Sequence, residues 1–479
     1  MASRVVRAQT ADGKVLEDGV RAIQRELGLN PDFPPDVLEA ARSAVQRAVL
    51  PDLDCTDVPF VTLDPPDAMD LDQALHIERA GEGYVVHYAI ADIAAFVEAD
   101  GPIDREAHRR GETLYGADTR IPLHPPVLSE DAASLLPGEV RPALVWSIKL
   151  DEQGEGIDVD VRRARVRSRA RFDYASVQQQ IDAGTQDELW TLLREVGELR
   201  IKREQIRGGI NLPLPEQEIV VEGDRWSIRF RAPLPVEEWN SQISLLTGMA
   251  AAHLMLYAEV GVLRTLPQAD HHVVQRLHRT ALALGIPWPA EQLYPDFVRG
   301  LDASRSEHAA MIAACTQLLR GSGYIGFEDA VPEHPEHAAL ASEYAHVTAP
   351  LRRLVDRYGG EVCVSLCADR EVPEWVRAKL PELPKTMDES ARRAGQYEHA
   401  ILALAEAGVL APLVGETFTG VVTEVQRGEP TAGSVLVRAP AVEAKVYGST
   451  PLPLGEEIRV RLVEADVATR VVRFESVAG

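Results

Sequence analysis

The sequence has no run of about eighteen or more uncharged apolar residues, which is the shortest length expected of a membrane-spanning helix. It also lacks a basic start followed by an apolar stretch, the pattern of a secretory signal. We therefore expect a cytoplasmic protein without a membrane partner. Cysteine is scarce, and none of the four cysteines has CxxC spacing, which argues against zinc ligation. We expect small, buried apolar side chains at Cys55, Cys315, Cys363 and Cys367.

Basic residues are too few to balance the acidic ones. The chain has 50 lysines and arginines against 74 aspartates and glutamates, a net charge of −24. A protein that coats nucleic acid with its whole surface needs the opposite sign, so any nucleic acid would have to meet a local basic lining. Residues 162–171 contain six arginines, of which the last four alternate and would form a single row on a strand. The alternative is a solvated edge strand whose charges prevent aggregation.

What the sequence does have is a dense cluster of aspartates, DPPDAMDLDQ at 64–73, directly after the apolar run 58–63. Carboxylates this close repel one another unless divalent cations neutralise them, and oxygen ligands without His or Cys suit Mg²⁺ or Mn²⁺. On an extended chain Asp70 and Asp72 share one face, and the leucine between them points to a core. Asp64 would close the site from the preceding strand end. The alternative is a solvated acidic turn, whereas an EF-hand is excluded because its glycine and closing glutamate are missing.

Several segments follow this cluster in a characteristic order. They are VVHYAIADIAAFV at 85–97, GETLY at 111–115, IPLHPPVLS at 121–129, VRSRARFDY at 166–174 and HVTAPLRR at 346–353, the last of them close to HFTSPIRR. Their order and spacing resemble the catalytic RNB domain of the ribonuclease II family, over roughly residues 51–410. The resemblance implies a Mg²⁺-dependent enzyme built on a mixed sheet with long helices.

The resemblance also implies roles for individual residues. Asp64, Asp70 and Asp72 match the metal-binding aspartates, with Asp72 also catalytic. Arg352 matches the arginine that faces the scissile phosphate in the family, where a guanidinium stabilises transition-state charge through directed hydrogen bonds. Arg353 is the alternative for this role. It is also open that one arginine of this pair only braces the helix that follows. The expected RNA contacts are two aromatic residues near the terminal nucleotides and three arginines: Tyr115, Tyr174, Arg167, Arg169 and Arg353.

Two parts of the expected site depart from the family pattern. Gln73 stands where the family has a further aspartate in its DxDDA ending, so we expect an uncharged metal ligand there. Asp67 could compensate by turning inward, since it lies three residues from both neighbouring aspartates. In the segment that corresponds to the family's EEFMLLAN helix, ungapped matching puts Gln242 at a glutamate position. Whether Glu238 reaches the site instead stays open.

The sequence predicts an α+β, multidomain chain in three parts, at 1–50, 51–410 and 414–479. The first part carries two amphipathic helical patterns and predicts a small helical module, either helix-turn-helix-like or a plain hairpin, in place of the family's cold-shock domains. The last part holds five short β-rich runs with turn signals, which suits an OB-fold and resembles an S1 domain.

These features lead to the hypothesis of a processive 3′→5′ exoribonuclease that hydrolyses single-stranded RNA to nucleoside 5′-monophosphates, with Mg²⁺ or Mn²⁺ as cofactor. Single-stranded RNA, bound by its 3′ end, is the one partner that the sequence indicates. Two other hypotheses stay open. A catalytically weak RNA-binding protein that keeps the fold would lack Mg²⁺-dependent nucleotide release. A Mg²⁺-dependent phosphohydrolase acting on short nucleotides would prefer a dinucleotide to a long oligomer.

Overall fold

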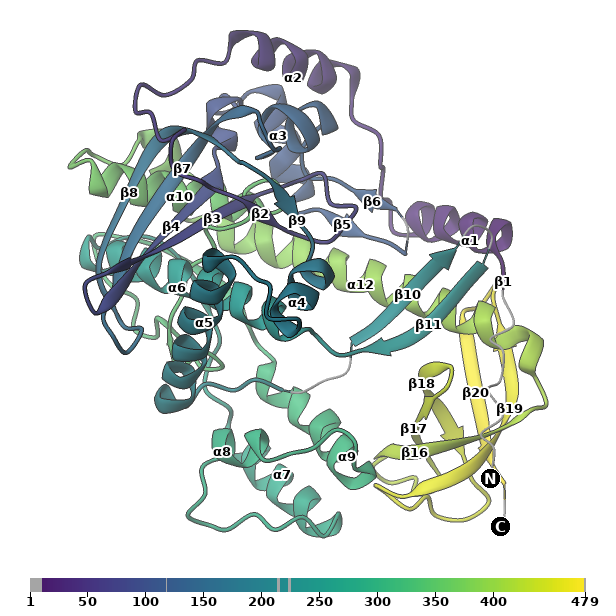
Figure 1. The fold of residues 1–479 in the computed structure, drawn as a ribbon. Helices are drawn as coiled ribbons and strands as arrows, with labels where there is room; N and C mark the ends of the chain where they lie inside the picture. The colour runs from purple at the N-terminus through teal and green to yellow at the C-terminus, as the bar shows by residue number, and fades with distance from the viewer. Residues whose placement is uncertain (1–10, 118, 213–215, 223–224, 478–479) are drawn as a thin grey trace.

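The computed structural model describes residues 11–117, 119–212, 216–222 and 225–477. The first ten residues of the expected N-terminal module and the last two of the expected C-terminal domain lie outside them. Figure 1 shows a sheet covered by helices, a hairpin of β10 (Glu216–Glu222) and β11 (Arg225–Arg231), and a small barrel near the C-terminus. No helix of the described residues is long and apolar enough to cross a membrane.

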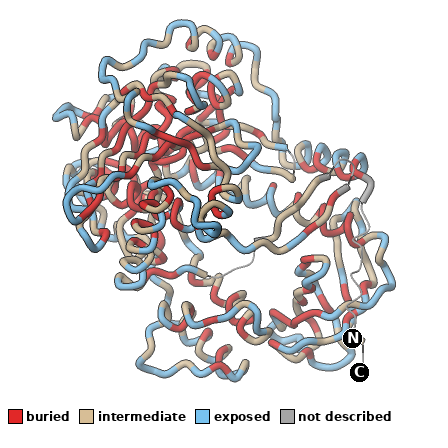
Figure 2. The backbone as a smooth tube through the Cα atoms, in the orientation of Figure 1, coloured by how far each residue is buried: buried red, intermediate tan, exposed pale blue. Residues whose placement is uncertain are grey.

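A four-stranded antiparallel sheet forms the centre of the largest region. Its strands follow the order β3 (Gln73–Ala80), β4 (Gly83–Ala91), β7 (Val140–Leu150) and β8 (Gly156–Arg167). Successive residues of β4 point to opposite faces, as strand geometry requires. Val86, Tyr88 and Ile90 enter one hydrophobic cluster, whereas Ala89 and Ala91 enter another. The sheet is therefore buried on both faces, and Figure 2 shows this concentration of buried residues.

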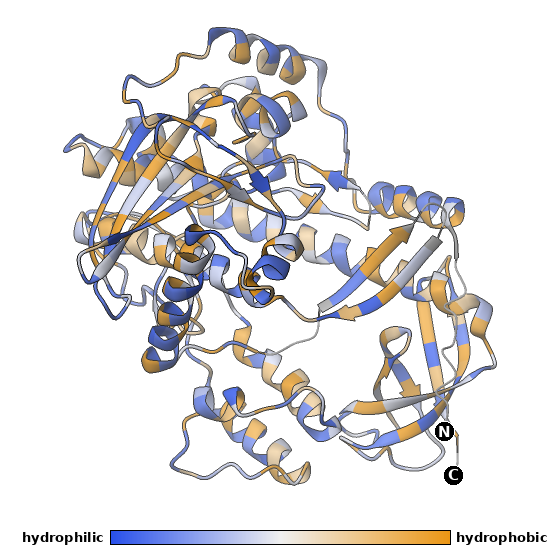
Figure 3. Ribbon diagram, in the orientation of Figure 1, coloured by the Kyte–Doolittle hydropathy of each residue, from blue (hydrophilic) through white to orange (hydrophobic). Residues whose placement is uncertain are grey.

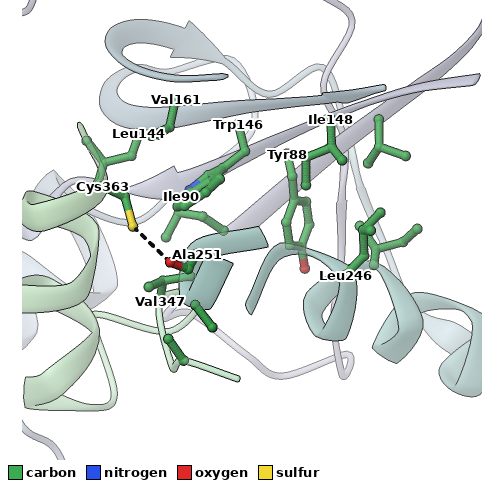
Figure 4. Close-up of a cluster of buried hydrophobic side chains, with 14 of the residues drawn as sticks. Tyr88, Ile90, Leu144, Trp146, Ile148, Val161, Leu246, Ala251, Val347 and Cys363 are labelled. Carbon is green, nitrogen blue, oxygen red and sulfur yellow. Dashed lines mark hydrogen bonds between the residues drawn. The ribbon is translucent and has the colours of Figure 1, made fainter. Parts of the chain in front are cut away.

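The larger cluster packs the sheet against α6 (Pro235–Tyr257) and α10 (Leu354–Cys367). Figure 4 shows Trp146 of the sheet in this cluster with Leu246 of α6 and Cys363 of α10. The Cys363 thiol donates a hydrogen bond to the carbonyl of Ala251 (3.8 Å). All four cysteines are free, and the prediction of burial is confirmed for two of them, Cys363 and Cys315.

The remaining helices surround this core and include the long helices that the sequence predicts. They are α3 (Pro102–Arg110), α4 (Tyr174–Asp182), α5 (Glu188–Arg207), α7 (His271–Ala283), α8 (Tyr294–Arg299), α9 (Ser306–Cys315), α11 (Glu374–Arg377) and α12 (Leu383–Leu410). The hydrophobic cluster of α7, α8 and α9 is separate from the core of the sheet.

The two N-terminal helices are present but do not pack as a pair. α1 (Gly13–Glu26) buries Leu16 in a cluster with Leu404 of α12. In contrast, α2 (Pro35–Arg47) buries Val37 in the cluster on the second face of the sheet. Figure 1 shows the two helices at separate places, and β1 (Ala11–Asp12) extends the β10–β11 hairpin. Both predicted N-terminal helices are therefore present, but each buries its apolar stripe against a different surface, and a helix-turn-helix-like role stays a prediction.

Short strands connect the loops around the sheet. The pairs are β2 (Thr62–Leu63) with β9 (Arg171–Phe172), β5 (Leu114–Tyr115) with β6 (Arg120–Ile121), β12 (Val260–Thr265) with β13 (Gly323–Glu328), and β14 (Glu336–His337) with β15 (Ser342–Glu343). The first pair is parallel and ends directly before the acidic segment, so it sets where that segment begins.

The C-terminal region is a closed five-stranded barrel, which confirms the predicted OB-type domain. The strand order is β16 (Thr417–Val425), β17 (Ala432–Arg438), β18 (Ala441–Tyr447), β20 (Val471–Ser476) and β19 (Glu457–Asp466). Apolar residues alternate along these strands in Figure 3, and Val422, Val435 and Phe474 lie fully buried inside the barrel.

Candidate active site

Asp64 lies directly after β2, at the start of the acidic segment. Its backbone N–H donates to the carbonyl of Phe172 (3.1 Å), so the β2–β9 pairing fixes where its side chain begins. The carboxylate oxygen Oδ2 is buried and has no hydrogen-bond partner. Burial raises the pKa of Asp64 to about 6, while the charge of Arg352 opposes this shift and that of Asp70 adds to it. A buried carboxylate oxygen without a partner offers a ligand position to a cation.

Asp72 connects the acidic segment to the HVTAPLRR segment. It is 1 % exposed. One carboxylate oxygen accepts a hydrogen bond from the backbone N–H of Leu351 (2.8 Å), and the other accepts one from Nε of Arg352 (2.7 Å). Burial raises the pKa of Asp72 above its usual range, against the opposing attraction of Arg352. Two segments about 280 residues apart in the sequence therefore meet at this carboxylate.

Asp70 is paired with Arg120 of β6, whose Nη1 lies 2.6 Å from the carboxylate. Arginines thus hold both Asp70 and Asp72. In the described part of the chain, no three Asp, Glu, His or Cys side chains are grouped as a metal site. The donors still fit a hard cation, because all are carboxylate oxygens and Oδ2 of Asp64 has no protein partner.

Gln73 is held by hydrogen bonds at both ends of its amide. Its Nε2 donates to the carbonyl of Thr348 (2.6 Å), and its Oε1 accepts from the hydroxyl of Tyr88 (2.8 Å), which also contacts Ser244 (2.9 Å). The glutamine thus bridges β3 to the HVTAPLRR segment, and its role as a metal ligand stays a prediction. Asp67, the proposed substitute, is exposed on the preceding turn.

The two neighbouring arginines have different environments. Arg353 donates through Nε and Nη2 to Asp356 of α10 (2.9 and 2.8 Å), and Asp356 also accepts from the backbone N–H of Ala349 (2.6 Å). This pair ties the HVTAPLRR turn to α10. Arg352 instead points to Asp72, and its side chain is 39 % exposed. The geometry therefore favours Arg352 as the arginine that reaches a phosphate.

Both expected tyrosines lie around Arg352. The Tyr115 side chain interacts with the Arg352 guanidinium, and this tyrosine is 40 % exposed. The Tyr174 hydroxyl accepts a hydrogen bond from Nδ2 of Asn240 (3.2 Å). Burial and then the charge of Asp64 raise the pKa of Tyr174 to about 12. The fold therefore brings two aromatic rings close to the acidic cluster.

The arginine row binds the protein's own loop. Arg165 donates to the carbonyls of residues 51 and 52 (3.1 and 3.2 Å), and Arg169 donates to that of residue 56 (2.7 Å). Arg171 donates to the carbonyls of the two prolines after Asp64. These contacts brace the segment that carries the acidic cluster. In Arg167 a buried Nε has no hydrogen-bond partner, and RNA binding by Arg167 and Arg169 stays a prediction.

Glu238 and Gln242 of α6, whose roles the sequence leaves undecided, both face α5. Nε2 of Gln242 donates to Glu204 of α5 (2.7 Å), and burial, followed by the charge of Glu204, raises the pKa of Glu238. Asn240 and Ser244 lie on another face of α6 and contact the tyrosines of the candidate active site. Neither residue has a motif of its own in the sequence, and only their spacing of four, which is the spacing of one helical face, indicates that they lie together.

Two family profiles match the chain. The RNB domain matches residues 53–359, which is more than half of the 479 residues. The RNase II-type exonuclease C-terminal S1 domain matches residues 416–477. The chain belongs to the RNB-domain family.

Named relatives share this architecture. Ribonuclease R 1 of Lactococcus lactis is 24 % identical over 494 residues, which cover 93 % of this chain and 59 % of the relative, so the chain spans less than two thirds of that protein's length. The solved RNase R of Mycoplasma genitalium has a TM-score of 0.85 at 19 % identity, over 96 % of this chain and 78 % of that one. Yeast Ssd1, described as a pseudonuclease, has a TM-score of 0.70 at 13 % identity, over 90 % and 55 %. The two structures are similar to this chain in fold.

Proposed function

We propose that the protein is a 3′→5′ exoribonuclease that hydrolyses single-stranded RNA processively to nucleoside 5′-monophosphates in the cytoplasm. The observation that carries the proposal is the contact of Arg352 with Asp72, which puts a partly exposed guanidinium beside Asp64 and Asp70. The RNase R of Mycoplasma genitalium, solved in complex with single-stranded RNA, supports the choice of substrate.

Each group of side chains has a distinct task in this reaction. Asp64, Asp70 and Asp72 would hold Mg²⁺ or Mn²⁺, which neutralises phosphate charge and lowers the pKa of the attacking water. Arg352 presents its remaining N–H groups to an oxygen of the scissile phosphate and stabilises the charge that grows there. The rings of the two nearby tyrosines would stack on the terminal bases, and stacking tolerates any base, as a non-specific exonuclease requires.

The test is to follow 5′-labelled single-stranded RNA with Mg²⁺, with Mn²⁺ and with EDTA. We expect a ladder that shortens from the 3′ end, nucleoside 5′-monophosphates as products, and no cleavage in EDTA. Undiminished cleavage in EDTA would contradict the proposal that the reaction needs a metal ion. Release of nucleoside 3′-monophosphates would contradict the assigned chemistry.

One observation favours a second candidate, an RNA-binding protein with weak or no catalysis. Gln73 brings no charge where the family has an aspartate, and hydrogen bonds with Tyr88 and Thr348 occupy its amide. Yeast Ssd1 is a pseudonuclease of similar fold. Under this alternative the protein binds labelled RNA but releases no nucleotide with either Mg²⁺ or Mn²⁺.

A further inference from the structure

A cavity lies outside the candidate active site, between α5, α6, α8 and the start of β8. Its volume is about 1000 Å³, and small-molecule pockets are typically about 300–1,000 Å³. Arg200 and Arg207 of α5 line it on one side, and Leu246 and Met249 of α6 line it on another. In Figure 3 the C-terminal half of α5 is mostly hydrophilic.

Two arginines of this cavity have buried N–H groups without partners. Arg200 is 2 % exposed, and although its Nη1 donates to the carbonyl of Gly154 (2.9 Å), its Nε has no partner. In Arg207 both Nε and Nη2 are buried without a partner. Burial and then the charge of Arg207 lower the pKa of Arg200 to about 10. Buried donors that lack acceptors are unfavourable, so an acceptor that entered here would stabilise both side chains.

The neighbouring carboxylates do not balance these cations. Glu155 is bound by Arg203 (2.7 Å) and is 3.7 Å from Arg200. Glu204 accepts a hydrogen bond from an α6 glutamine. Three guanidinium groups, those of Arg200, Arg203 and Arg207, thus face two carboxylates. The arginine end of the cavity therefore has one more guanidinium group than carboxylates, in a chain whose net charge is −24.

The opening of the cavity is lined by exposed apolar side chains. Ile157, Tyr257 and Leu293 line the cavity and are 65 %, 93 % and 69 % exposed. Tyr294 is half-buried beside them, and burial raises its pKa. Exposed apolar side chains gathered around one cavity mark a binding surface. A ligand for this cavity therefore combines an anionic group with a flat or apolar one.

The rim of the cavity argues against a long polyanion. Asp158, Glu336 and Glu343 also line the cavity, together with Glu155. Asp158 is paired with Lys149 (2.6 Å), Glu343 lies 3.4 Å from His253, and Glu336 is exposed. These carboxylates repel every further phosphate of a strand, whereas a monophosphate bound by Arg200 and Arg207 brings only one phosphate into this lining.

We propose that this cavity binds a nucleoside 5′-monophosphate, with its phosphate on Arg200 and Arg207 and its base against the apolar wall at Tyr294. The proposal concerns binding alone and does not depend on cleavage of RNA by the protein. Two guanidinium groups with free N–H donors suit the oxygens of a phosphate monoester.

The test is calorimetric titration of the full-length protein with adenosine 5′-monophosphate in buffer without divalent cations. We expect Arg207→Gln to weaken binding by about tenfold or more, because it removes charge-assisted hydrogen bonds to the phosphate. The matched control is Arg194→Gln, the same substitution at an exposed position of α5 that pairs with Glu198. We expect the control to bind as the wild type does. Melting of each variant without ligand checks that Arg207, in the last turn of α5, is not required for folding.

Three further titrations distinguish this cavity from the candidate active site and show which part of the ligand it binds. Tyr115→Ala in the candidate active site should leave the affinity for adenosine 5′-monophosphate unchanged. If Tyr115→Ala loses binding while Arg207→Gln keeps it, the nucleotide binds in the active site instead. Adenosine should bind at least about tenfold more weakly, since it lacks the anion. Equal binding of adenosine would overturn the role of the arginines, and equal binding of inorganic phosphate would overturn the nucleoside part of the proposal.

Discussion

The candidate active site and the arginine end of the Arg200–Arg207 cavity are opposite in charge but built on the same principle. Each contains buried ionisable atoms without a partner, Oδ2 of Asp64 in the first and guanidinium nitrogens in the second. Some other buried charges are fully paired, such as Asp356 with Arg353 (2.8 Å). Because an unpaired buried charge is unfavourable, its presence indicates a ligand, and its sign indicates the charge of that ligand.

The largest expected effect tests the acidic side of this comparison. Asp72→Asn removes a charged ligand and the ion pair with Arg352, so we expect cleavage of single-stranded RNA to fall by at least about a thousandfold. RNA affinity should be unchanged or higher, because negative charge near the phosphates is lost. Gel assays of cleavage and fluorescence anisotropy of labelled RNA measure the two quantities. Asp131→Asn, at a 65 % exposed carboxylate, is the control and should cleave normally. Normal cleavage by Asp72→Asn would make Asp72 a structural residue.

The next effect concerns pH. The pKa of Asp64 is raised to about 6, so the fraction of ionised carboxylate falls as the pH falls below that value. A proton then competes with the cation, and the Mg²⁺ concentration for half-maximal cleavage should rise by up to about tenfold per pH unit below about 6. Above about pH 8 it should be constant, because Asp72, whose pKa burial raises to about 7, is then ionised as well. Mg²⁺ titrations at pH 5, 6, 7 and 8 measure this dependence, and a requirement that does not change between pH 5 and 8 would contradict the role of Asp64.

The acidic cluster can be predicted from the sequence because its candidate ligands are close in the chain. Four aspartates within nine residues indicate a metal site without any knowledge of the fold. The resemblance of the HVTAPLRR segment to the family motif also predicts that Arg352 lies beside these aspartates. The sequence could not show that Arg120 pairs with Asp70, because only folding brings β6 against the acidic segment. Nor could it show that Arg169 binds a loop carbonyl, since an alternating row of arginines looks the same whether it faces RNA or the protein.

The basic cavity cannot be predicted in the same way. Arg200 and Arg207 are seven residues apart on a helix that also carries Arg194 and Lys202, so in the sequence they are typical of a solvated helix face. Their burial depends on packing against α6 and β8. The N-terminal helices show the same limit. Each amphipathic pattern predicts its helix correctly, but the pattern does not say which surface will cover the apolar side.

A smaller expected effect is on the free energy of unfolding, which should change in opposite directions when an unpaired and a paired carboxylate are neutralised. Raising a carboxyl pKa from 3.8 to about 6 means that the folded state binds the proton more tightly, so above that pH the charge destabilises the fold. In EDTA at pH 8, Asp64→Asn should increase the free energy of unfolding by about 2 kcal/mol, and the gain should vanish near pH 4. Asp356→Asn, which breaks the pair with Arg353, should instead decrease it by about 3 kcal/mol. Urea unfolding measures both. Destabilisation by Asp64→Asn at pH 8 would mean that Asp64 has a partner within the protein.

The smallest expected effect concerns Gln73, which lies between the acidic cluster and its support. Gln73→Asp adds a charge that attracts a cation, but it also loses the N–H that Gln73 donates to Thr348, at a stability cost of about 1 kcal/mol. We therefore expect the Mg²⁺ concentration for half-maximal cleavage to fall only by about twofold to fivefold. Asp67→Asn should leave the titration unchanged, because Asp67 is exposed on its turn. If Asp67→Asn raises the Mg²⁺ requirement while Gln73→Asp has no effect, Asp67 is the compensating carboxylate and Gln73 acts only as a bridge between Tyr88 and Thr348.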